Sequence, residues 1–256
     1  MENKFIVSPG KHSDQEKQMR NEFLEFFLNK NPVPKEELFY NIGLYINRQT
    51  LSRIIYMNEL YQKILDVPGV IMEFGVRWGT NLALFENFRG MYEPYRNNRK
   101  VIGFDTFSGY PDVSESDINK SNAAFMKKGA YDMPDNYEEI LDYILRYHEK
   151  ESPISHIKKY EIVKGDVCNT LCEYLENNPH TMIALAYFDI NLYEPAKECL
   201  KRILPHMAKG SIIGFDELNY SGFPGETIAL KEVLGLPNVR IHASRTFPSC
   251  SFMYIE

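Results

Sequence analysis

Residues 70–81 read Val-Ile-Met-Glu-Phe-Gly-Val-Arg-Trp-Gly-Thr-Asn, and the prediction of the fold begins from this stretch. A short apolar run, Val70 to Met72, leads to Glu73 and to glycines at positions 75 and 79. The apolar residues at positions 82, 84, 85 and 88 have the spacing of a helix rather than a strand. The stretch therefore predicts a strand, a glycine turn and a helix, the unit that places a ligand above the C-terminal end of a strand.

The composition of this glycine turn limits the ligands that it can hold. The glycine spacing is not the Gly-x-Gly-x-x-Gly of dinucleotide-binding folds, and the lack of a following Gly-Lys-Ser/Thr excludes a P-loop. Glu73 would repel a pyrophosphate, but it would suit a cationic amino-acid group such as that of S-adenosylmethionine. The stretch alone leaves open an ordinary strand–helix turn with two incidental glycines.

Length and composition indicate a globular protein with one α/β domain and an appendage. The 256 residues carry a net charge of -6, which argues against nucleic-acid binding. No apolar segment approaches the length of a membrane span, and the N-terminus lacks the layout of a signal peptide. The four cysteines lack the partners of a zinc site, so we expect reduced thiols in a cytoplasmic protein.

Residues 1–66 are predicted to form a helical N-terminal extension or cap. Helices are expected over residues 14–28, 35–46 and 50–65, the last with a clear apolar face. These helices would pack on one edge of the sheet or cover a ligand pocket. Their apolar residues are also consistent with a homo-oligomer.

Residues 67–256 predict an α/β domain with a Rossmann-like, mostly parallel, seven-stranded sheet. The strands are expected near residues 70–73, 101–105, 160–164, 184–188, 210–215, 239–243 and 251–255. The last two are short and close in sequence, which predicts a C-terminal antiparallel hairpin. The polar stretch 112–153 is long for a connection, so we expect a lid-like insertion that faces a substrate.

Several of the predicted strands end in acidic residues. Asp105 ends the second strand, where nucleotide-binding α/β folds accept hydrogen bonds from ribose. Asp166 follows the third strand and is a candidate partner for an adenine amino group. Asp189 ends the fourth strand, and Asp216 and Glu217 end the fifth.

The last three of these carboxylates are expected to meet, because neighbouring parallel strands lie roughly 5 Å apart. Three adjacent carboxylates repel one another unless a cation lies among them. Oxygen ligands suit Mg²⁺, Mn²⁺ or Ca²⁺ rather than zinc or copper. The alternative is that Asp189 caps the next helix and Glu217 points into water.

Five motifs occur in a fixed order along the chain. They are Glu-Phe-Gly-Val-Arg-Trp-Gly-Thr (73–80), Gly-Phe-Asp-Thr-Phe-Ser-Gly-Tyr-Pro (103–111), Val-Lys-Gly-Asp-Val-x-x-Thr-Leu (163–171), Phe-Asp-Ile-Asn-Leu-Tyr-Glu (188–194) and Phe-Asp-Glu-Leu (215–218). This set resembles the macrocin O-methyltransferase (TylF/MycF-type) family of class I S-adenosylmethionine-dependent methyltransferases, over about residues 50–229. The resemblance implies methylation of a sugar hydroxyl with the help of a divalent metal, usually Mg²⁺.

The resemblance also implies a role for individual residues. It places the cofactor on Glu73, Gly75, Gly79, Thr80, Asp105, Thr106 and Asp166. It places the metal, expected to be Mg²⁺, on Asp189, Asp216 and Glu217. Many relatives have Asp-Asp where this chain has Asp216-Glu217, so the extra methylene could change the metal distance or free Glu217 from coordination.

The implied reaction needs a group that takes the proton of the sugar hydroxyl. A divalent cation lowers the pKa of a bound hydroxyl and fixes its position in line with the sulfonium methyl group. Catechol-type relatives use a lysine shortly after the first metal acid, but Ile-Asn-Leu-Tyr follows Asp189 here. Asp189 itself is therefore the candidate proton acceptor, ahead of Tyr193 and His242.

The expected acceptor is a sugar, for example a nucleotide-activated heptose for surface polysaccharide. A macrolide-type natural product or a small catechol is the alternative. An NAD-dependent oxidoreductase with Asp105 on the ribose is disfavoured by the glycine spacing. An inactive binding module is disfavoured by the intact set of acids, since unused buried carboxylates cost stability.

Overall fold

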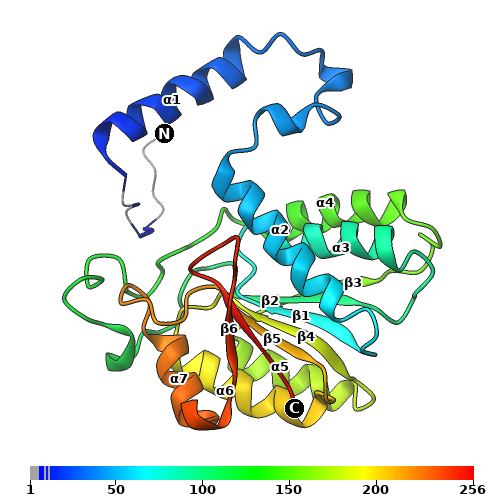
Figure 1. Ribbon diagram of the computed structural model, residues 1–256, viewed down its shortest axis with the longest axis vertical. Helices are drawn as coiled ribbons and strands as arrows, with labels where there is room; N and C mark the ends of the chain where they lie inside the picture. The colour runs from blue at the N-terminus through cyan, green and yellow to red at the C-terminus, as the bar shows by residue number, and fades with distance from the viewer. Residues whose placement is uncertain (1–5, 9, 11) are drawn as a thin grey trace.

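A seven-stranded sheet runs through the computed structural model, which describes residues 6–8, 10 and 12–256 (Figure 1). In sheet order the strands are β3 (Tyr160–Lys164), β2 (Val101–Asp105), β1 (Val70–Phe74), β4 (Ile183–Phe188), β5 (Ile212–Phe215), β7 (Ser251–Tyr254) and β6 (Ile241–Ala243). Pairing is parallel from β3 to β5, whereas β7 is antiparallel to both β5 and β6. The predicted mostly parallel sheet with a C-terminal antiparallel hairpin is confirmed.

Helices cover both faces of this sheet (Figure 1). One face packs against α2 (Arg48–Lys63), α3 (Thr80–Tyr92) and α4 (Tyr137–Glu151), and the other against α5 (Val167–Asn177), α6 (Tyr193–Ile203) and α7 (Gly225–Val233). Short 3-10 turns lie at Lys35–Glu37, Ile42–Leu44, Glu115–Asp117, Leu204–His206 and Leu236–Asn238. No helix in the described ranges is both long and apolar enough to cross a membrane.

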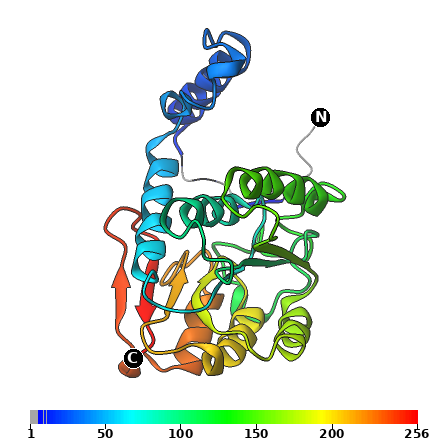
Figure 2. The ribbon, with the colours of Figure 1, turned by 90° about the vertical axis from the view of Figure 1, so that its right-hand side faces the viewer.

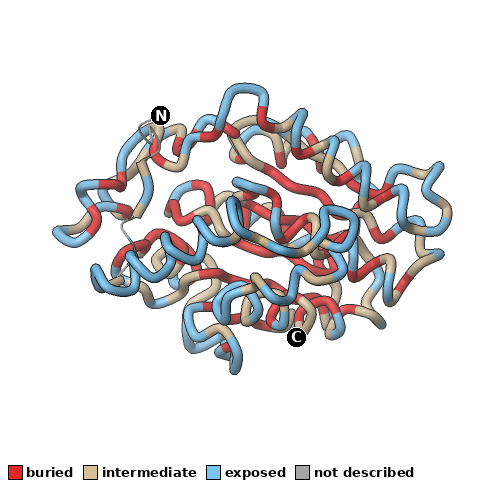
Figure 3. Tube along the Cα trace, turned by 90° about the horizontal axis from the view of Figure 1, so that it is seen from above, coloured by how far each residue is buried: buried red, intermediate tan, exposed pale blue. Residues whose placement is uncertain are grey.

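The central strands are apolar along their whole length because both of their faces are covered. All six residues of β4 are buried. Leu185 and Tyr187 pack toward α2, α3 and α4, whereas Ala186 and Phe188 pack toward α5, α6 and α7. Figure 3 shows the buried segments gathered inside the two helical layers.

Helix α1 (Asp14–Asn29) projects away from the sheet and its helical layers (Figures 1 and 2). Ser13 caps the helix through a capping box with Glu16, yet none of its residues is buried. The helix predicted for residues 35–46 was wrong, because only two short 3-10 turns form there. The exposed side chains of Phe39 and Tyr40 provide no packed face that would stabilise a longer helix.

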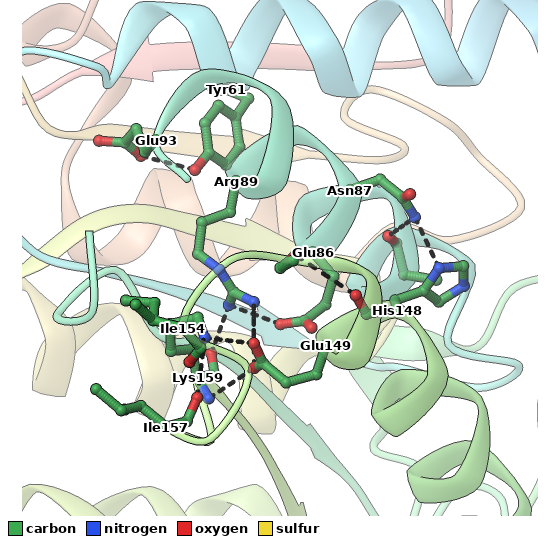
Figure 4. Close-up of polar contacts among 12 residues, drawn as sticks. Tyr61, Glu86, Asn87, Arg89, Glu93, His148, Glu149, Ile154, Ile157 and Lys159 are labelled. Carbon is green, nitrogen blue, oxygen red and sulfur yellow. Dashed lines mark hydrogen bonds and ion pairs between the residues drawn. The ribbon is translucent and has the colours of Figure 1, made fainter. Parts of the chain in front are cut away.

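A buried network of charged side chains joins α3, α4 and the start of β3 (Figure 4). Arg89 donates hydrogen bonds to Glu86 at 2.7 Å, to Glu149 at 3.2 Å and to the carbonyl oxygen of Lys159 at 2.8 Å. The Lys159 ammonium also pairs with Glu149. None of the four residues is more than 4% exposed, so two buried cations balance two buried acids.

Glu73 is a buried acid with a different environment. It is 1% exposed, its Oε1 accepts a hydrogen bond from Asn81 Nδ2 at 2.7 Å, and its Oε2 has no hydrogen-bond partner among the described residues. Burial away from water raises the pKa of Glu73 to about 8, although the Asn81 hydrogen bond opposes this shift.

We predict that Arg89→Met lowers the free energy of unfolding by about 3–5 kcal/mol, because it leaves two buried carboxylates without their shared partner. Urea denaturation measures the loss. Arg146→Met is the matched control. Arg146 pairs with Asp142 within helix α4, but its side chain is 59% exposed, so this variant should lose less than about 1 kcal/mol of unfolding free energy. Similar losses in the two variants would contradict a structural role for the network.

We predict that Glu73→Gln stabilises the protein increasingly as pH rises from about 5 to about 8. In this window the unfolded Glu73 is ionised while the folded side chain keeps its proton, so wild-type stability falls with pH by roughly 1.4 kcal/mol per pH unit. Glutamine does not titrate and avoids this loss. Unfolding measured at pH 5 and pH 8 gives the test, and an equal difference between the two proteins at both pH values would refute it.

Candidate active site

A cavity of about 330 Å³ lies at the C-terminal ends of the parallel strands. Its wall includes a residue from the end of each parallel strand or from the turn after it, namely Gly75, Asp105, Asp166, Asp189 and Asp216. The strand order reverses beside β1, with β2 on one side and β4 on the other. Open α/β sheets bind their ligands at such a reversal.

Gly75 allows the ends of β1 and β4 to come together. Its φ is +88°, and a Cβ atom at this position would lie 2.1 Å from the carbonyl oxygen of Asp189. Any larger residue would therefore push the two strand ends apart. The close contact that Gly75 permits is therefore made to the residue that follows the neighbouring strand β4.

Asp105 fixes the turn that follows Gly75. Its Oδ2 accepts hydrogen bonds from the backbone N–H groups of Val76 and Arg77, each at 2.7 Å, and its Oδ1 accepts one from Phe107 at 2.8 Å. A carboxylate offers about four acceptor positions, so Asp105 keeps capacity for a ligand hydroxyl on its cavity side.

Thr106 and Asp166 also line the cavity. The Thr106 hydroxyl donates to the carbonyl oxygen of Gly109 at 2.7 Å, and Asp166 caps α5 by accepting from the Cys168 N–H at 3.0 Å. Phe104 adds an apolar residue to the cavity wall. The β2–β3 side of the cavity thus combines a flat apolar surface with polar groups at its rim.

Three predicted cofactor residues lie outside this cavity wall. Glu73 is buried behind the turn against Asn81. Gly79 and Thr80 begin α3 and line a separate pocket against α4, where a Cβ on Gly79 would lie 2.2 Å from the Leu141 side chain. Their contact with a cofactor stays a prediction.

The three predicted metal acids, Asp189, Asp216 and Glu217, all line the cavity. Phe188 of β4 pairs with Phe215 of β5, so the residue after each strand lies beside the other. The alternative in which Asp189 caps the next helix is excluded, because Leu192 is the N-cap of α6.

Arg53 of helix α2 lies between two of these acids. Its Nη2 is 2.8 Å from Asp216 Oδ1, and its Nη1 is 3.7 Å from Asp189 Oδ2. The guanidinium also stacks over the ring of Phe247 at 5.0 Å. Sequence reasoning missed this residue, although a cation on the same helical face as Met57 is an available signal.

Other side chains hold Asp216 from behind. Its Oδ1 accepts a hydrogen bond from the Tyr187 hydroxyl at 2.7 Å and one from the Cys250 thiol at 3.3 Å. Both donors are buried, so the carboxylate is fixed in one orientation.

The predicted proton acceptor, Asp189, has a perturbed environment in this site. Asp189 is half-buried in the cavity wall, and this partial burial together with the nearby charge of Asp216 raises the pKa of Asp189 above its usual range, while Arg53 opposes this. A carboxylate with a raised pKa is a stronger proton acceptor. The weaker candidates lie elsewhere: the Tyr193 hydroxyl pairs with Glu232, and His242 stacks on Phe252 in the terminal hairpin.

The oxygen atoms of these acids are suitable ligands for a divalent metal ion, but the present arrangement of the acids does not form a metal site. Carboxylate oxygens are the donors that Mg²⁺ prefers. Within the described part of the chain, however, no group of three or more His, Cys, Asp or Glu residues is arranged to hold a metal ion. The Arg53 guanidinium lies between Asp189 and Asp216.

Solved structures similar to this chain include two of CalS11. A structure of CalS11, a calicheamicin methyltransferase, is 39% identical, with a TM-score of 0.90, and the match covers 97% of this chain and 98% of that one. The apo structure of CalS11, a TDP-rhamnose 3'-O-methyltransferase, is 37% identical, with a TM-score of 0.83 and 96% coverage of each chain. The O-methyltransferase NovP shares the fold, at 18% identity, a TM-score of 0.56 and 79% coverage of each chain.

No protein-family model and no curated protein matches this chain. The likeness to CalS11 nevertheless extends over almost the whole of both chains. It confirms the family that the ordered motifs predicted. The chain belongs to the macrocin-type O-methyltransferase family and is a class I, S-adenosylmethionine-dependent O-methyltransferase.

Proposed function

We propose that this enzyme transfers a methyl group from S-adenosylmethionine to a hydroxyl group of a nucleotide-activated sugar. The observation that carries the proposal is the 37–39% identity, over nearly the full length, to CalS11, which acts on TDP-rhamnose. A nucleotide-activated heptose for surface polysaccharide, suggested by the sequence, belongs to the same substrate class and is tested with it.

The β2–β3 side of the cavity suits the adenosine part of the methyl donor. Asp105 has acceptor capacity for ribose hydroxyls, and Asp166 stands at the rim where an adenine amino group would donate. Phe104 and Val167 supply apolar walls for the base. When bound, the sulfonium supplies an already activated methyl group, so the protein has to orient the acceptor oxygen and take its proton.

The other side of the cavity suits the acceptor. Tyr110, Tyr131 and Phe223 belong to one buried aromatic cluster and line this wall. Arg77 lies over the Tyr131 ring at 4.9 Å and also lines the cavity, which offers a cation to a diphosphate. The N-terminal arm adds a cover, since the Ser8 N–H donates to the Tyr131 hydroxyl at 3.0 Å.

Asp189 is proposed as the proton acceptor. It lies beside Gly75 and Asp216 on the wall of the cavity, where a carboxylate can take the proton of a bound hydroxyl. A divalent cation is proposed as a partner of the same reaction. Asp189, Asp216 and Glu217 would hold it only after a rearrangement that frees the two aspartates from Arg53, and it would supply charge that stabilises an ionised hydroxyl. Undiminished transfer in excess chelator would remove the metal from the scheme.

The proposed function predicts methyl transfer to a nucleotide sugar in preference to other hydroxyl compounds. Purified protein is incubated with S-adenosylmethionine and, separately, TDP-rhamnose, other nucleotide hexoses, a nucleotide heptose, a macrolide-linked sugar and a catechol. Mass spectrometry detects addition of a methyl group. Transfer confined to the catechol or the macrolide would overturn the proposal.

Asp189→Asn tests the proposed proton acceptor in the same assay. The amide keeps the size of the side chain but cannot take up a proton, so kcat should fall by about 10²- to 10⁴-fold. Calorimetric affinity for S-adenosylhomocysteine should stay close to that of the wild type. Full activity in this variant would show that another group accepts the proton.

We also propose that the N-terminal extension joins copies of this chain into a homo-oligomer. Helix α1 has no buried residue, and Phe39 and Tyr40, which follow it, are 80% and 91% exposed. Phe23, Leu24, Phe26 and Leu28 of α1 are exposed as well, and so many exposed large apolar side chains in one segment are typical of an interaction site. Light scattering should report a dimer or larger species, and Leu24→Glu with Phe39→Glu should shift it toward monomer; a monomeric wild type at micromolar concentration would contradict the proposal.

A further inference from the structure

The segment that follows Asp189 is held by a side chain from helix α7. Glu226 accepts hydrogen bonds through its Oε1 from the backbone N–H groups of Ile190 and Asn191, each at 2.9 Å. Glu226 is 2% exposed, and its Oε2 has no hydrogen-bond partner among the described residues. The carboxylate is therefore buried with these two backbone contacts as its hydrogen bonds in the described part of the chain.

The backbone of this segment depends on the Glu226 contacts. Asn191 has a φ of +64°, a left-handed conformation that asparagine adopts more readily than most residues but that still costs free energy. It is also buried, and a buried N–H group that loses its acceptor costs roughly 1–3 kcal/mol. Loss of the carboxylate would therefore favour a different conformation of the segment.

The same segment forms part of the cavity wall. Residues 190–192 line the cavity next to Asp189. The backbone is fixed before them, because the Asp189 N–H donates to the carbonyl oxygen of Phe74 at 2.9 Å. It is fixed after them as well, since the Tyr193 N–H donates to Asp117 Oδ1 at 2.6 Å. The carboxylate from α7 holds the part between these two points, directly after the proposed proton acceptor.

We propose that Glu226 is a positioning residue of the methyl-transfer reaction, which holds the backbone after Asp189 so that the Asp189 carboxylate faces the acceptor hydroxyl. Glu226 is not among the described residues that line the cavity, so it acts through the segment and not on the ligand. This inference rests on the role proposed for Asp189, but it does not depend on the identity of the acceptor.

The test compares two substitutions of Glu226 in methyl transfer to whichever acceptor of the panel the wild type methylates. Glu226→Met removes the hydrogen-bond acceptor but keeps an unbranched side chain, and kcat should fall by at least about tenfold, because a small misplacement of a reacting group is costly. Affinity for S-adenosylhomocysteine should change by less than about threefold, since the adenosine side of the cavity is formed at β2 and β3. Glu226→Gln keeps a carbonyl oxygen that can accept both N–H groups, so kcat should stay within about threefold of the wild type. Glu226→Ala takes the place of Glu226→Met if that variant does not fold.

Glu86→Met is the matched control. Glu86 is a buried acid whose Oε2 also has no hydrogen-bond partner among the described residues, but it pairs with Arg89 and does not line the cavity. This variant should lose stability and keep its kcat at a temperature where it is folded. Hydrogen–deuterium exchange needs no acceptor: amides 190 and 191 should exchange faster in Glu226→Met but not in Glu86→Met.

Three outcomes would overturn the inference. The first is a kcat in Glu226→Met close to that of the wild type. The second is an equal loss of kcat in Glu86→Met, which would trace the effect to lost stability. The third is an equal loss in Glu226→Gln, since the acceptor oxygen would then not matter. A selective loss in Glu226→Met, measured on an acceptor that is not a nucleotide sugar, would support this inference while refuting the proposed acceptor.

Discussion

Two carboxylates at the ends of adjacent strands repel each other, and the rest of the site depends on how that repulsion is balanced. Asp189 and Asp216 follow β4 and β5 at paired positions, so the sheet itself forces them together. Arg53 provides the compensating charge from helix α2. Because of this ion pair, helix α2 contributes a charge to the site as well as packing on one face of the sheet.

The backbone brings those acids to the same cavity as the first glycine turn. Gly75 permits a contact with the Asp189 carbonyl that no other residue would allow, and Asp105 holds the turn with three backbone hydrogen bonds. The strand order reverses beside β1, and open α/β sheets bind their ligands in the crevice at such a reversal. The strand that each acid follows therefore determines the side of the cavity on which that acid lies.

The sequence was sufficient to predict the sheet and most of the acids that line the cavity. The apolar run of β4 and the acids after each strand follow simple periodic rules, and Asp105, Asp166, Asp189 and Asp216 lie in the cavity wall. Helical spacing places Arg53 on the buried face of α2, but its acidic partners could not be predicted, because those contacts join segments more than a hundred residues apart. The outcome for residues 35–46 depends on tertiary packing, which local propensity does not contain.

The balance of charge differs between the buried Arg89 network and the cavity wall. Around Arg89, two cations meet two acids away from solvent, so that network is electrically complete and suits a structural role. At the cavity, a single guanidinium lies between two carboxylates, and Glu217 adds a third acid to the wall. Among the described residues, five acids and two arginines line the cavity, so its wall favours a cationic ligand, whereas the Arg89 network has no excess charge.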